Sequence, residues 1–288
     1  MQRGNYSYAF LLKKPFCFLL FTFDLTSAML SKKLLITGLA FLYASLFASA
    51  QNTRISNHNT IGWYNYFGTF KLSDRFSLHT EYQWRRNNII EEWQQSLLRT
   101  GINYQLNPKI QLRAGYAWGE TFPYGDIPIN GFGKDFTEHR IFEMATITDK
   151  VSSIDLSHRF MLEQRWVGRY SNANLQKEDD FIFLSRMRYM FRMQMPFTGN
   201  SIADKSPYAA LYDEIFIGLG RNVNENIFDQ NRLGFLLGYR FNKTVRLEGG
   251  FLSQVLQLGR EVDGRNVFQY NNGLVINLIF NIDLMQKH

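Results

Sequence analysis

Hydrophobic and polar residues alternate along most of the chain after residue 50. The clearest case is at the C-terminus, where apolar side chains from Phe268 to Leu284 occupy nearly every second position, with Gln269, Asn271 and Asp283 between them. Successive side chains of a strand point to opposite faces, so this segment is predicted to be a strand with one apolar and one polar face. No segment after residue 50 has a convincing helical period, so the pattern indicates an all-β fold.

Eleven segments show this alternation, and residues that favour turns separate them. Pairs such as Asn107-Pro108 and Asp263-Gly264 mark tight turns. Short connections tend to alternate with longer polar ones. The segments lie near residues 60–72, 75–86, 93–106, 109–121, 136–148, 154–167, 181–192, 208–220, 230–242, 244–258 and 266–284.

The length of these segments separates a membrane barrel from a soluble sandwich. Strands of soluble proteins are often about five or six residues long, whereas a tilted strand that crosses a bilayer needs roughly 9–11 residues. Only helices and closed barrels satisfy every backbone amide in lipid, so we predict a transmembrane antiparallel β-barrel. Bacterial barrels normally have an even number of strands. We therefore expect ten to twelve strands and favour twelve, with ten as the alternative. Either Asn52–Thr60 supplies an additional strand, or one strand is split or missed around 193–207.

The N-terminus has the features of an export signal. From Met29, a short basic region is followed by an apolar stretch of 14 residues, 34–47, and by the small-x-small sequence Ala48-Ser49-Ala50. These are the three parts of a secretory signal peptide, and the apolar core is shorter than the roughly 20 residues of a membrane-spanning helix. We predict cleavage after Ala50; the alternative is an uncleaved membrane anchor. The chain then divides into a mis-assigned extension (1–28), the signal peptide (29–50) and the barrel (51–288).

Removal of the signal peptide changes the charge of the chain. The segment 1–50 carries five of the 32 basic residues and one of the 25 acidic residues, which leaves 27 basic and 24 acidic residues. A net charge of +3 spread along a barrel gives no basis for nucleic-acid binding. Cys17 is the only cysteine and is also removed, so disulfides, thiolate metal sites and cysteine nucleophiles are excluded.

The polar face of the predicted strands gathers arginine and glutamate. The planar guanidinium makes bidentate contacts and stays charged, which suits a confined ionic lumen. Two interpretations remain open: a lumen filled by Arg–Glu pairs, which we favour, or a narrow pore in which excess arginine selects anions. Strand parity assigns ten arginines and four glutamates to this lumen array: Glu81, Arg85, Arg99, Arg113, Arg159, Glu163, Arg165, Arg186, Arg188, Glu214, Arg232, Arg240, Arg246 and Glu248.

Tryptophan placement is consistent with a membrane interface. Trp84, Trp118 and Trp166 lie on the apolar face near the C-terminal ends of strands that longer loops follow. Aromatic girdles mark both rims of membrane barrels, so we expect these residues to form part of one. The alternative is the general preference of aromatic residues for strands.

No motif points to catalysis or to a metal. Some outer-membrane barrels are lipid hydrolases with a Ser–His pair on the outer wall. His158 has apolar-face parity, but its neighbour Ser157 points to the opposite face and cannot form a nucleophile–base pair with it. No histidines are spaced as metal ligands, and the acidic clusters Glu91-Glu92 and 178–180 are typical of solvated loops or of cation bridges to lipopolysaccharide. We expect no enzyme activity, no cofactor and no metal site.

Short motifs along the chain resemble one known family. They are Trp63-Tyr64-Asn65-Tyr66, the segment 162–166 (Leu-Glu-Gln-Arg-Trp), Arg186-x-Arg188, the segment 212–216 (Tyr-Asp-Glu-Ile-Phe), and Asn231-Arg232 with Gly238-Tyr239. Together they resemble an uncharacterised family of bacterial outer-membrane β-barrels, domain of unknown function 2490. The resemblance covers nearly the whole mature chain and implies a barrel fold, but no activity.

The sequence as a whole predicts an integral outer-membrane barrel of structural or binding type with a lumen filled by arginine and glutamate. The alternative is a small anion-leaning pore or transporter that passes an ion or small molecule, and a lipid hydrolase is the least favoured possibility. The expected location is the outer membrane of a double-membraned bacterium. The expected partners are outer-membrane lipid, lipopolysaccharide and, during biogenesis, the barrel-insertion machinery.

Overall fold

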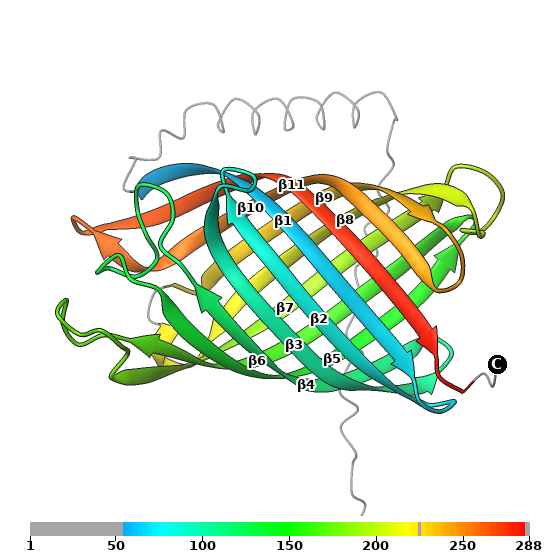
Figure 1. Ribbon diagram of the computed structural model, residues 1–288, viewed down its shortest axis with the longest axis horizontal. Coiled ribbons are helices and arrows are strands. Elements are labelled where there is room, and N and C mark those ends of the chain that lie inside the picture. The colour runs from blue at the N-terminus through cyan, green and yellow to red at the C-terminus, as the bar shows by residue number, and fades with distance from the viewer. Residues whose placement is uncertain (1–53, 224–225, 286–288) are drawn as a thin grey trace, which may run out of the picture. The chain divides into compact units, whose positions relative to one another are not determined.

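The computed structural model describes residues 54–223 and 226–285, which form a closed β-barrel of eleven strands (Figure 1). The predicted signal peptide and its cleavage site at Ala48 and Ala50 lie outside this part of the chain. One turn of 3-10 helix, η1 (Arg221–Val223), precedes β9. Within the described residues, no helix is long and apolar enough to cross a membrane. The strands are β1 (Arg54–Lys71), β2 (Phe76–Asn87), β3 (Glu92–Asn107), β4 (Ile110–Thr121), β5 (Phe136–Val151), β6 (Ile154–Arg169), β7 (Asp180–Pro196), β8 (Ser206–Leu219), β9 (Phe228–Arg240), β10 (Val245–Val262) and β11 (Arg265–Asp283).

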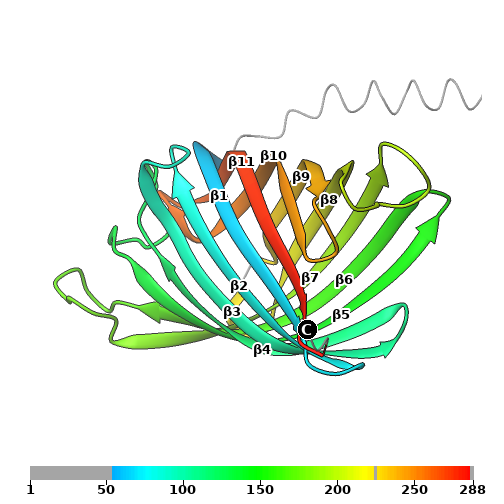
Figure 2. The ribbon, with the colours of Figure 1, turned by 45° about the vertical axis from the view of Figure 1, so that its right-hand side comes forward.

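The barrel closes through a parallel pair. Each strand is antiparallel to the next along the chain, whereas β1 pairs with β11 in parallel from Arg54↔Asn266 to Lys71↔Asp283. Figure 2 shows β1 between β2 and β11. Because an odd number of antiparallel strands leaves the first and last running the same way, this seam can close only in parallel.

The number of strands is eleven, inside the predicted range of ten to twelve, and the preference for twelve is wrong. The two regions that were expected to supply another strand do not form one within the described residues. Residues from Arg54 onward extend β1, and residues 193–196 extend β7. After Pro196 the chain turns through Gly199, whose φ is +76°, and pairs again only from Ser206. The evenness rule failed because the parallel seam accommodates an odd strand count.

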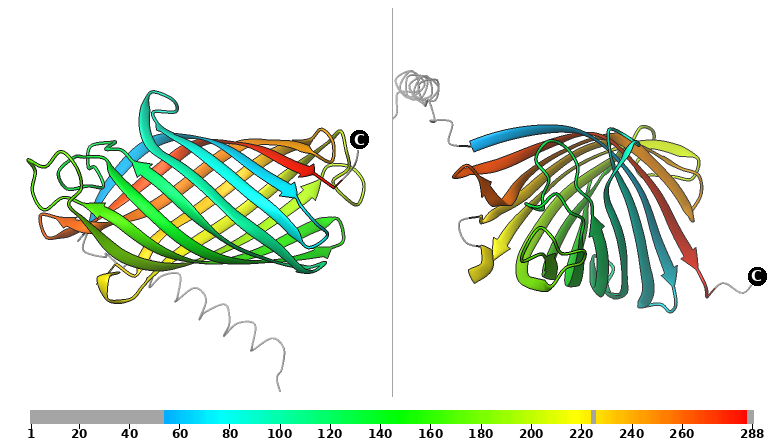
Figure 3. Two further views of the ribbon diagram at one scale, coloured as in Figure 1. Left: turned by 60° about the horizontal axis from the view of Figure 1, so that its bottom comes forward. Right: turned by 60° about the vertical axis from the view of Figure 1, so that its left-hand side comes forward.

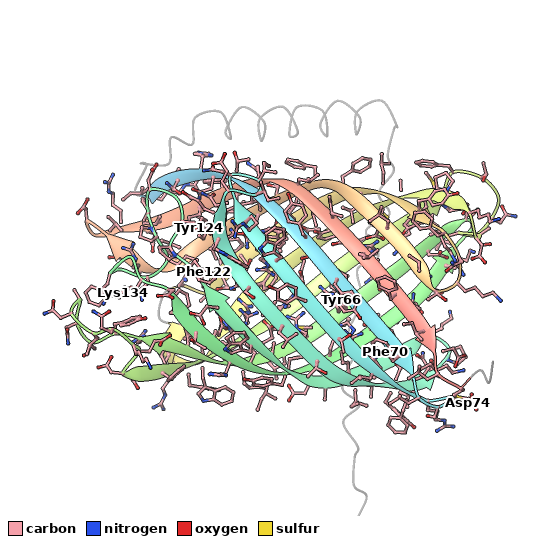
Figure 4. The ribbon with its side chains drawn as sticks, in the orientation of Figure 1. Tyr66, Phe70, Asp74, Phe122, Tyr124 and Lys134 are labelled. Atoms are coloured by element: carbon pink, nitrogen blue, oxygen red, sulfur yellow. The ribbon has the colours of Figure 1, made fainter. Side chains whose placement is uncertain are left out.

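Five connections between strands lie at each end of the barrel. Figure 3 (right) brings one end forward, and Figure 4 places Tyr124 and Lys134 at that end and Asp74 at the other. Asp263 and Gly264 have φ values of +52° and +66°, as a tight Asp-Gly turn requires. The loop end carries the connections 88–91, 122–135, 170–179, 220–227 and 263–264, and the turn end carries 72–75, 108–109, 152–153, 197–205 and 241–244.

The apolar and polar faces are inverted relative to a soluble protein. On the outer wall, Phe235 is 52% exposed and Leu237 is 55% exposed, whereas Glu163 on the inner wall is 0% exposed. Carboxyl groups also occur on the apolar outer wall, among them those of Glu143 and Asp213. Glu143 accepts a hydrogen bond from the Gln164 amide at 3.1 Å, and Asp213 accepts one from the Asn231 amide at 2.8 Å.

Apolar side chains fill one side of the lumen. Tyr208, Leu236 and Leu252 are fully buried and pack with Ile202 of the loop 197–205. Gly238 leaves room for the ring of Tyr208, because a Cβ at that position would overlap it. The interior is therefore packed by side chains on this side, and the charged residues line the remainder.

Candidate functional site

Glu163 of β6 is the centre of an ion-pair lattice inside the barrel. Its carboxylate accepts hydrogen bonds from Arg186 Nε at 2.6 Å, Arg188 Nη1 at 2.9 Å and Arg99 Nη2 at 3.5 Å. Arg140 Nη1 lies 4.0 Å away. Strands β3, β5 and β7 all present arginine to this one acid, so Glu163 connects opposite parts of the wall through its neighbours.

Glu214 of β8 forms the second centre. Its Oε1 atom accepts hydrogen bonds from Arg159 Nη2 at 2.7 Å and from Arg188 Nη2 at 2.7 Å. Arg188 therefore joins Glu163 to Glu214. The ring of Phe216 lies under the guanidinium groups of Arg188 and Arg232, at 4.4 and 4.6 Å, and such cation–π contacts stabilise desolvated arginine.

The lattice extends along β2 through Glu81. Arg99 Nη1 donates to both oxygens of the Glu81 carboxylate, at 2.7 and 2.9 Å. His79 Nε2 lies 3.1 Å from the same carboxylate, and Gln83 donates its amide to it. Glu81 is only 3% exposed, so its charge depends on these partners.

Towards the loop end, the lattice uses two acids that parity did not assign. Glu138 accepts hydrogen bonds from Arg140 Nε at 2.8 Å and from Arg165. Asp229 accepts one from Arg186 Nη1 at 2.6 Å and lies 3.9 Å from Arg165.

Near the turn end, the predicted residues belong to smaller groups. Glu248 accepts hydrogen bonds from Tyr208 at 2.8 Å and from Arg192. Arg240 lies 2.9 Å from Asp204 of the loop 197–205. The lattice around Glu163 therefore does not extend as one network to this end.

The structure buries nine of the fourteen residues of the predicted lumen array and places the other five at intermediate exposure. Among the latter, Arg113 donates to Asn103, and Arg246 has no ion-pair partner within the described residues. The buried set is Glu81, Arg85, Arg99, Glu163, Arg186, Arg188, Glu214, Arg232 and Glu248, and the intermediate set is Arg113, Arg159, Arg165, Arg240 and Arg246.

Arg85 and Arg232 differ from the buried arginines of the lattice because, among the described residues, neither contacts a carboxylate at hydrogen-bond distance. Arg85 donates to Gln83 at 2.9 Å and to Gln95 at 2.7 Å, and Arg232 donates to Gln230 at 3.1 Å. The nearest carboxylate oxygen to Arg232 is 3.9 Å away, on Glu214. Their positive charges are therefore balanced by amide oxygens rather than by acids.

The loop 122–135 folds inward over this region. The Tyr124 hydroxyl donates to Gln269 at 2.8 Å and accepts from Asn271 at 3.2 Å, which ties the loop to the inner face of β11. Burial raises the pKa of the Tyr124 phenol, so the hydroxyl stays protonated. Lys134 donates to the carbonyl of Ala173 at 2.6 Å and so joins this loop to the loop 170–179.

Beneath the loop lies a cavity of about 470 Å³. Its walls combine apolar side chains, among them Phe132 and Phe136, with a strong excess of positive charge. Among the described lining residues, arginine outnumbers acid by seven to two: Arg85, Arg140, Arg165, Arg169, Arg186, Arg232 and Arg260 line the cavity together with Glu138 and Asp229.

The sequence profile of a family described as "Protein of unknown function (DUF2490)" matches residues 60–264. The chain belongs to this family. No curated protein and no solved structure matches the chain. The predicted resemblance is thereby confirmed for the family, which carries no assigned activity.

Several charged residues of this DUF2490 barrel were missed by sequence reasoning, chiefly on β5. Glu138 and Arg140 point inward there, but so do Phe142 and Met144, while Glu143 points outward. Because the inner face of β5 mixes apolar and charged residues, the alternation along β5 does not show from sequence which of its two faces points into the lumen. Arg192 shares the parity of Arg186 and Arg188 on β7, and this signal could have placed it in the array.

The three predicted girdle tryptophans of the barrel lie on the outer wall at the loop-end half of their strands. Trp118 and Trp166 are both in register with His139 of β5 and so flank it. Trp84 belongs to a neighbouring aromatic group with Trp93, whose ring centroid is 6.1 Å away. Whether this row lies at a membrane interface stays a prediction.

Two outward-facing histidines of the DUF2490 barrel contact tyrosine hydroxyls. His139 Nδ1 lies 2.5 Å from the Tyr116 hydroxyl, and His158 Nδ1 lies 2.9 Å from the Tyr189 hydroxyl. Across 54–223 and 226–285, no group of three His, Cys, Asp or Glu residues is arranged to hold a metal ion.

Proposed function

We propose that this protein is an integral outer-membrane β-barrel of structural or binding type, whose lumen is closed by its own side chains. The observation that carries this proposal is the inversion of the two faces. Large apolar side chains such as Leu233, Phe235 and Leu237 cover the outer wall at 45–55% exposure, whereas charged side chains are buried inside. A soluble monomer rarely exposes a continuous apolar surface of this kind, and lipid is the solvent that favours it.

The outward carboxyl groups of Glu143 and Asp213 are compatible with that environment. Glu143 and Asp213 each accept a hydrogen bond from an amide on the neighbouring strand. A polar group costs less free energy in an apolar medium when it is hydrogen-bonded. Outer-membrane lipid and lipopolysaccharide would be the molecules that contact this wall, and barrel-insertion machinery would place it there.

The lattice supports a filled lumen over an open pore. Glu163 is 0% exposed, and Arg186, Arg188 and Glu214 are 3–4% exposed, so these side chains leave little room for water around them. The excess of arginine would favour anions if the lumen opened, and this keeps an anion-leaning pore as the second candidate. The paired arginines favour the filling role, because each reaches a carboxylate at hydrogen-bond distance.

Location in the membrane is tested by expressing the full chain in a double-membraned bacterium and separating its membranes on a density gradient. We expect the protein to sediment with the outer membrane and to migrate faster on a gel before boiling than after. Recovery in the soluble fraction or in the inner membrane would contradict the proposal.

A substitution on the outer wall sharpens this test. Phe235→Arg places a charge on the apolar face, and near the bilayer midplane this costs about 2–4 kcal/mol, so assembly should fall. Phe235→Leu is the matched control and should assemble normally. In a soluble barrel the arginine would face water, so undiminished folding of Phe235→Arg would argue against a lipid-facing wall.

A further inference from the structure

The cavity at the loop end is lined by two arginines that, unlike those of the ion-pair lattice, have amide rather than carboxylate partners. In the lattice, arginines such as Arg186 and Arg188 contact carboxylates within 3 Å. Arg85 and Arg232 line the cavity without such contacts to any carboxylate of the described residues, and they are only 6% and 8% exposed. A buried cation without an acid is costly, so these two residues are the part of the lumen that an anion would stabilise most.

Trp63 of β1 holds the two arginines near each other. The guanidinium of Arg85 lies 3.9 Å from the centroid of its indole ring, and that of Arg232 lies 4.8 Å from it. The indole N–H donates to Gln94 at 2.7 Å, which fixes the ring. Two like charges are thus held against one aromatic ring, with amide oxygens as their hydrogen-bond partners, and negative charge placed beside them would relieve their repulsion.

Apolar side chains also line the cavity. Phe136 is 8% exposed, and Phe132 of the loop 122–135 lies at the mouth with 47% of its surface exposed. A volume of about 470 Å³ falls in the range typical of small-molecule sites rather than of macromolecular ones. The site therefore combines an excess of positive charge with apolar surface.

We propose that this cavity binds a small organic anion with two negative charges, whose charged groups contact Arg85 and Arg232 and whose apolar body lies against Phe132 and Phe136. The ligand class comprises aromatic or aliphatic dicarboxylates and phosphate monoesters, since both present paired anionic oxygens to the guanidinium fork. The inference rests on the proposed binding role of a closed lumen, which makes the cavity a site with one entrance.

The test is equilibrium dialysis of the full chain, purified in detergent, against three naphthalene probes. Naphthalene-2,6-dicarboxylate and 2-naphthyl phosphate are the dianions, and naphthalene-2,6-dicarboxamide is the neutral control. We expect one or both dianions to bind at least about ten-fold more tightly than the diamide, because charge-assisted hydrogen bonds are the stronger ones. The dianion that binds more tightly identifies the carboxylate or the phosphate source. Equal affinity for all three probes, or no dianion binding at millimolar concentration, would overturn the proposal.

Variants locate the binding to this cavity. Arg85→Gln and Arg232→Gln should each lower dianion affinity about ten-fold or more, whereas Arg113→Gln removes a lumen arginine outside the cavity lining and should leave it unchanged. Phe132→Asp changes an exposed loop residue, so the barrel should fold, and the added negative charge should weaken dianion binding. Equal loss in Arg113→Gln, or full binding by Phe132→Asp, would contradict the assignment.

This experiment is independent of where the protein resides. Dialysis in detergent reports binding alone, whereas the density gradient reports location alone. A barrel that binds the dianion but sediments elsewhere would refute the proposed location and leave the site in place.

Discussion

Replacing Glu163 with glutamine removes the negative charge at the centre of the lattice and keeps the shape of the side chain. The carboxylate is 0% exposed and accepts from Arg186, Arg188 and Arg99 at 2.6, 2.9 and 3.5 Å. Glutamine retains one acceptor oxygen but turns an amide N–H₂ towards a guanidinium. The change therefore leaves several buried positive charges with less compensation.

The expected loss of stability follows from these contacts. A hydrogen bond to a charged group contributes about 1.5–3 kcal/mol, and at least two of the three contacts lose their charge-assisted character. Removing one partner of a buried ion pair typically costs about 3–5 kcal/mol. We expect Glu163→Gln to lower the free energy of unfolding of the barrel by about 3–5 kcal/mol.

The assay is denaturant unfolding of the barrel in lipid vesicles, followed by tryptophan fluorescence. Glu261→Gln, an exposed acid near the end of β10, is the matched control and should change the midpoint little. The double variant Glu163→Gln/Arg186→Gln should lose less than the sum of the two single variants, because removal of the arginine relieves the uncompensated charge. A loss below about 1 kcal/mol, the size of an exposed salt bridge, would refute the lattice as a stabilising centre.

Three further changes test the β1–β11 seam, the attachment of the loop 122–135 and the pH dependence of the loop 170–179. Gly273→Ala should destabilise the barrel, because the new Cβ would overlap the Ile61 carbonyl oxygen across the β1–β11 seam, and thermal unfolding measures it. Tyr124→Phe removes the donor that ties the loop 122–135 to the wall and should cost about 1 kcal/mol, with faster proteolysis of that loop. Hydrogen bonding by Ser171 lowers the pKa of Asp179. The stabilisation from this hydrogen bond is therefore fully present at pH values above the ordinary aspartate pKa, and it is lost as the pH falls through the lowered pKa of Asp179. Pepsin cleavage of the loop 170–179 should increase in that acidic range, and Asp179→Asn should remove the pH dependence of this cleavage.

The glycine substitution has a matched control within the chain, and each of the other two changes has an outcome that would contradict it. Gly249→Ala should be tolerated, since its nearest neighbour would lie 3.9 Å from the new Cβ; equal loss in both glycine variants would argue against a strained seam. Unchanged proteolysis in Tyr124→Phe would show that other contacts hold the loop. A flat pH profile in the unmodified chain would contradict the role given to Asp179.

The fold was largely predictable because the alternation of side chains survives in most strands. The eleven segments match β1 to β11, with boundary differences of a few residues at most ends. The choice of twelve strands failed because strand number depends on how the first and last strands meet. That pairing joins residues such as Arg54 and Asn266, and no local pattern encodes its parallel direction.

The charged interior was predictable only where parity was clean. On β7, Arg186 and Arg188 alternate with apolar residues, and both reach the lattice. On β5, Phe142 and Met144 share the inner face with Glu138, so the same reasoning gave no assignment. The cavity could not be predicted at all, because it depends on the loop conformation that brings Tyr124 to β11.

The central claim is that the charged lumen is closed, and electrical conductance across a planar bilayer tests it most directly. Protein extracted from the membranes of cells that express the full chain should insert into the bilayer and give no discrete current steps. The reason is that the surrounding side chains leave Glu163 0% exposed. Glu163→Gln, which loosens the lattice, should give intermittent anion-preferring openings. Steady anion-selective steps from the unmodified protein would contradict the closed lumen and establish a pore.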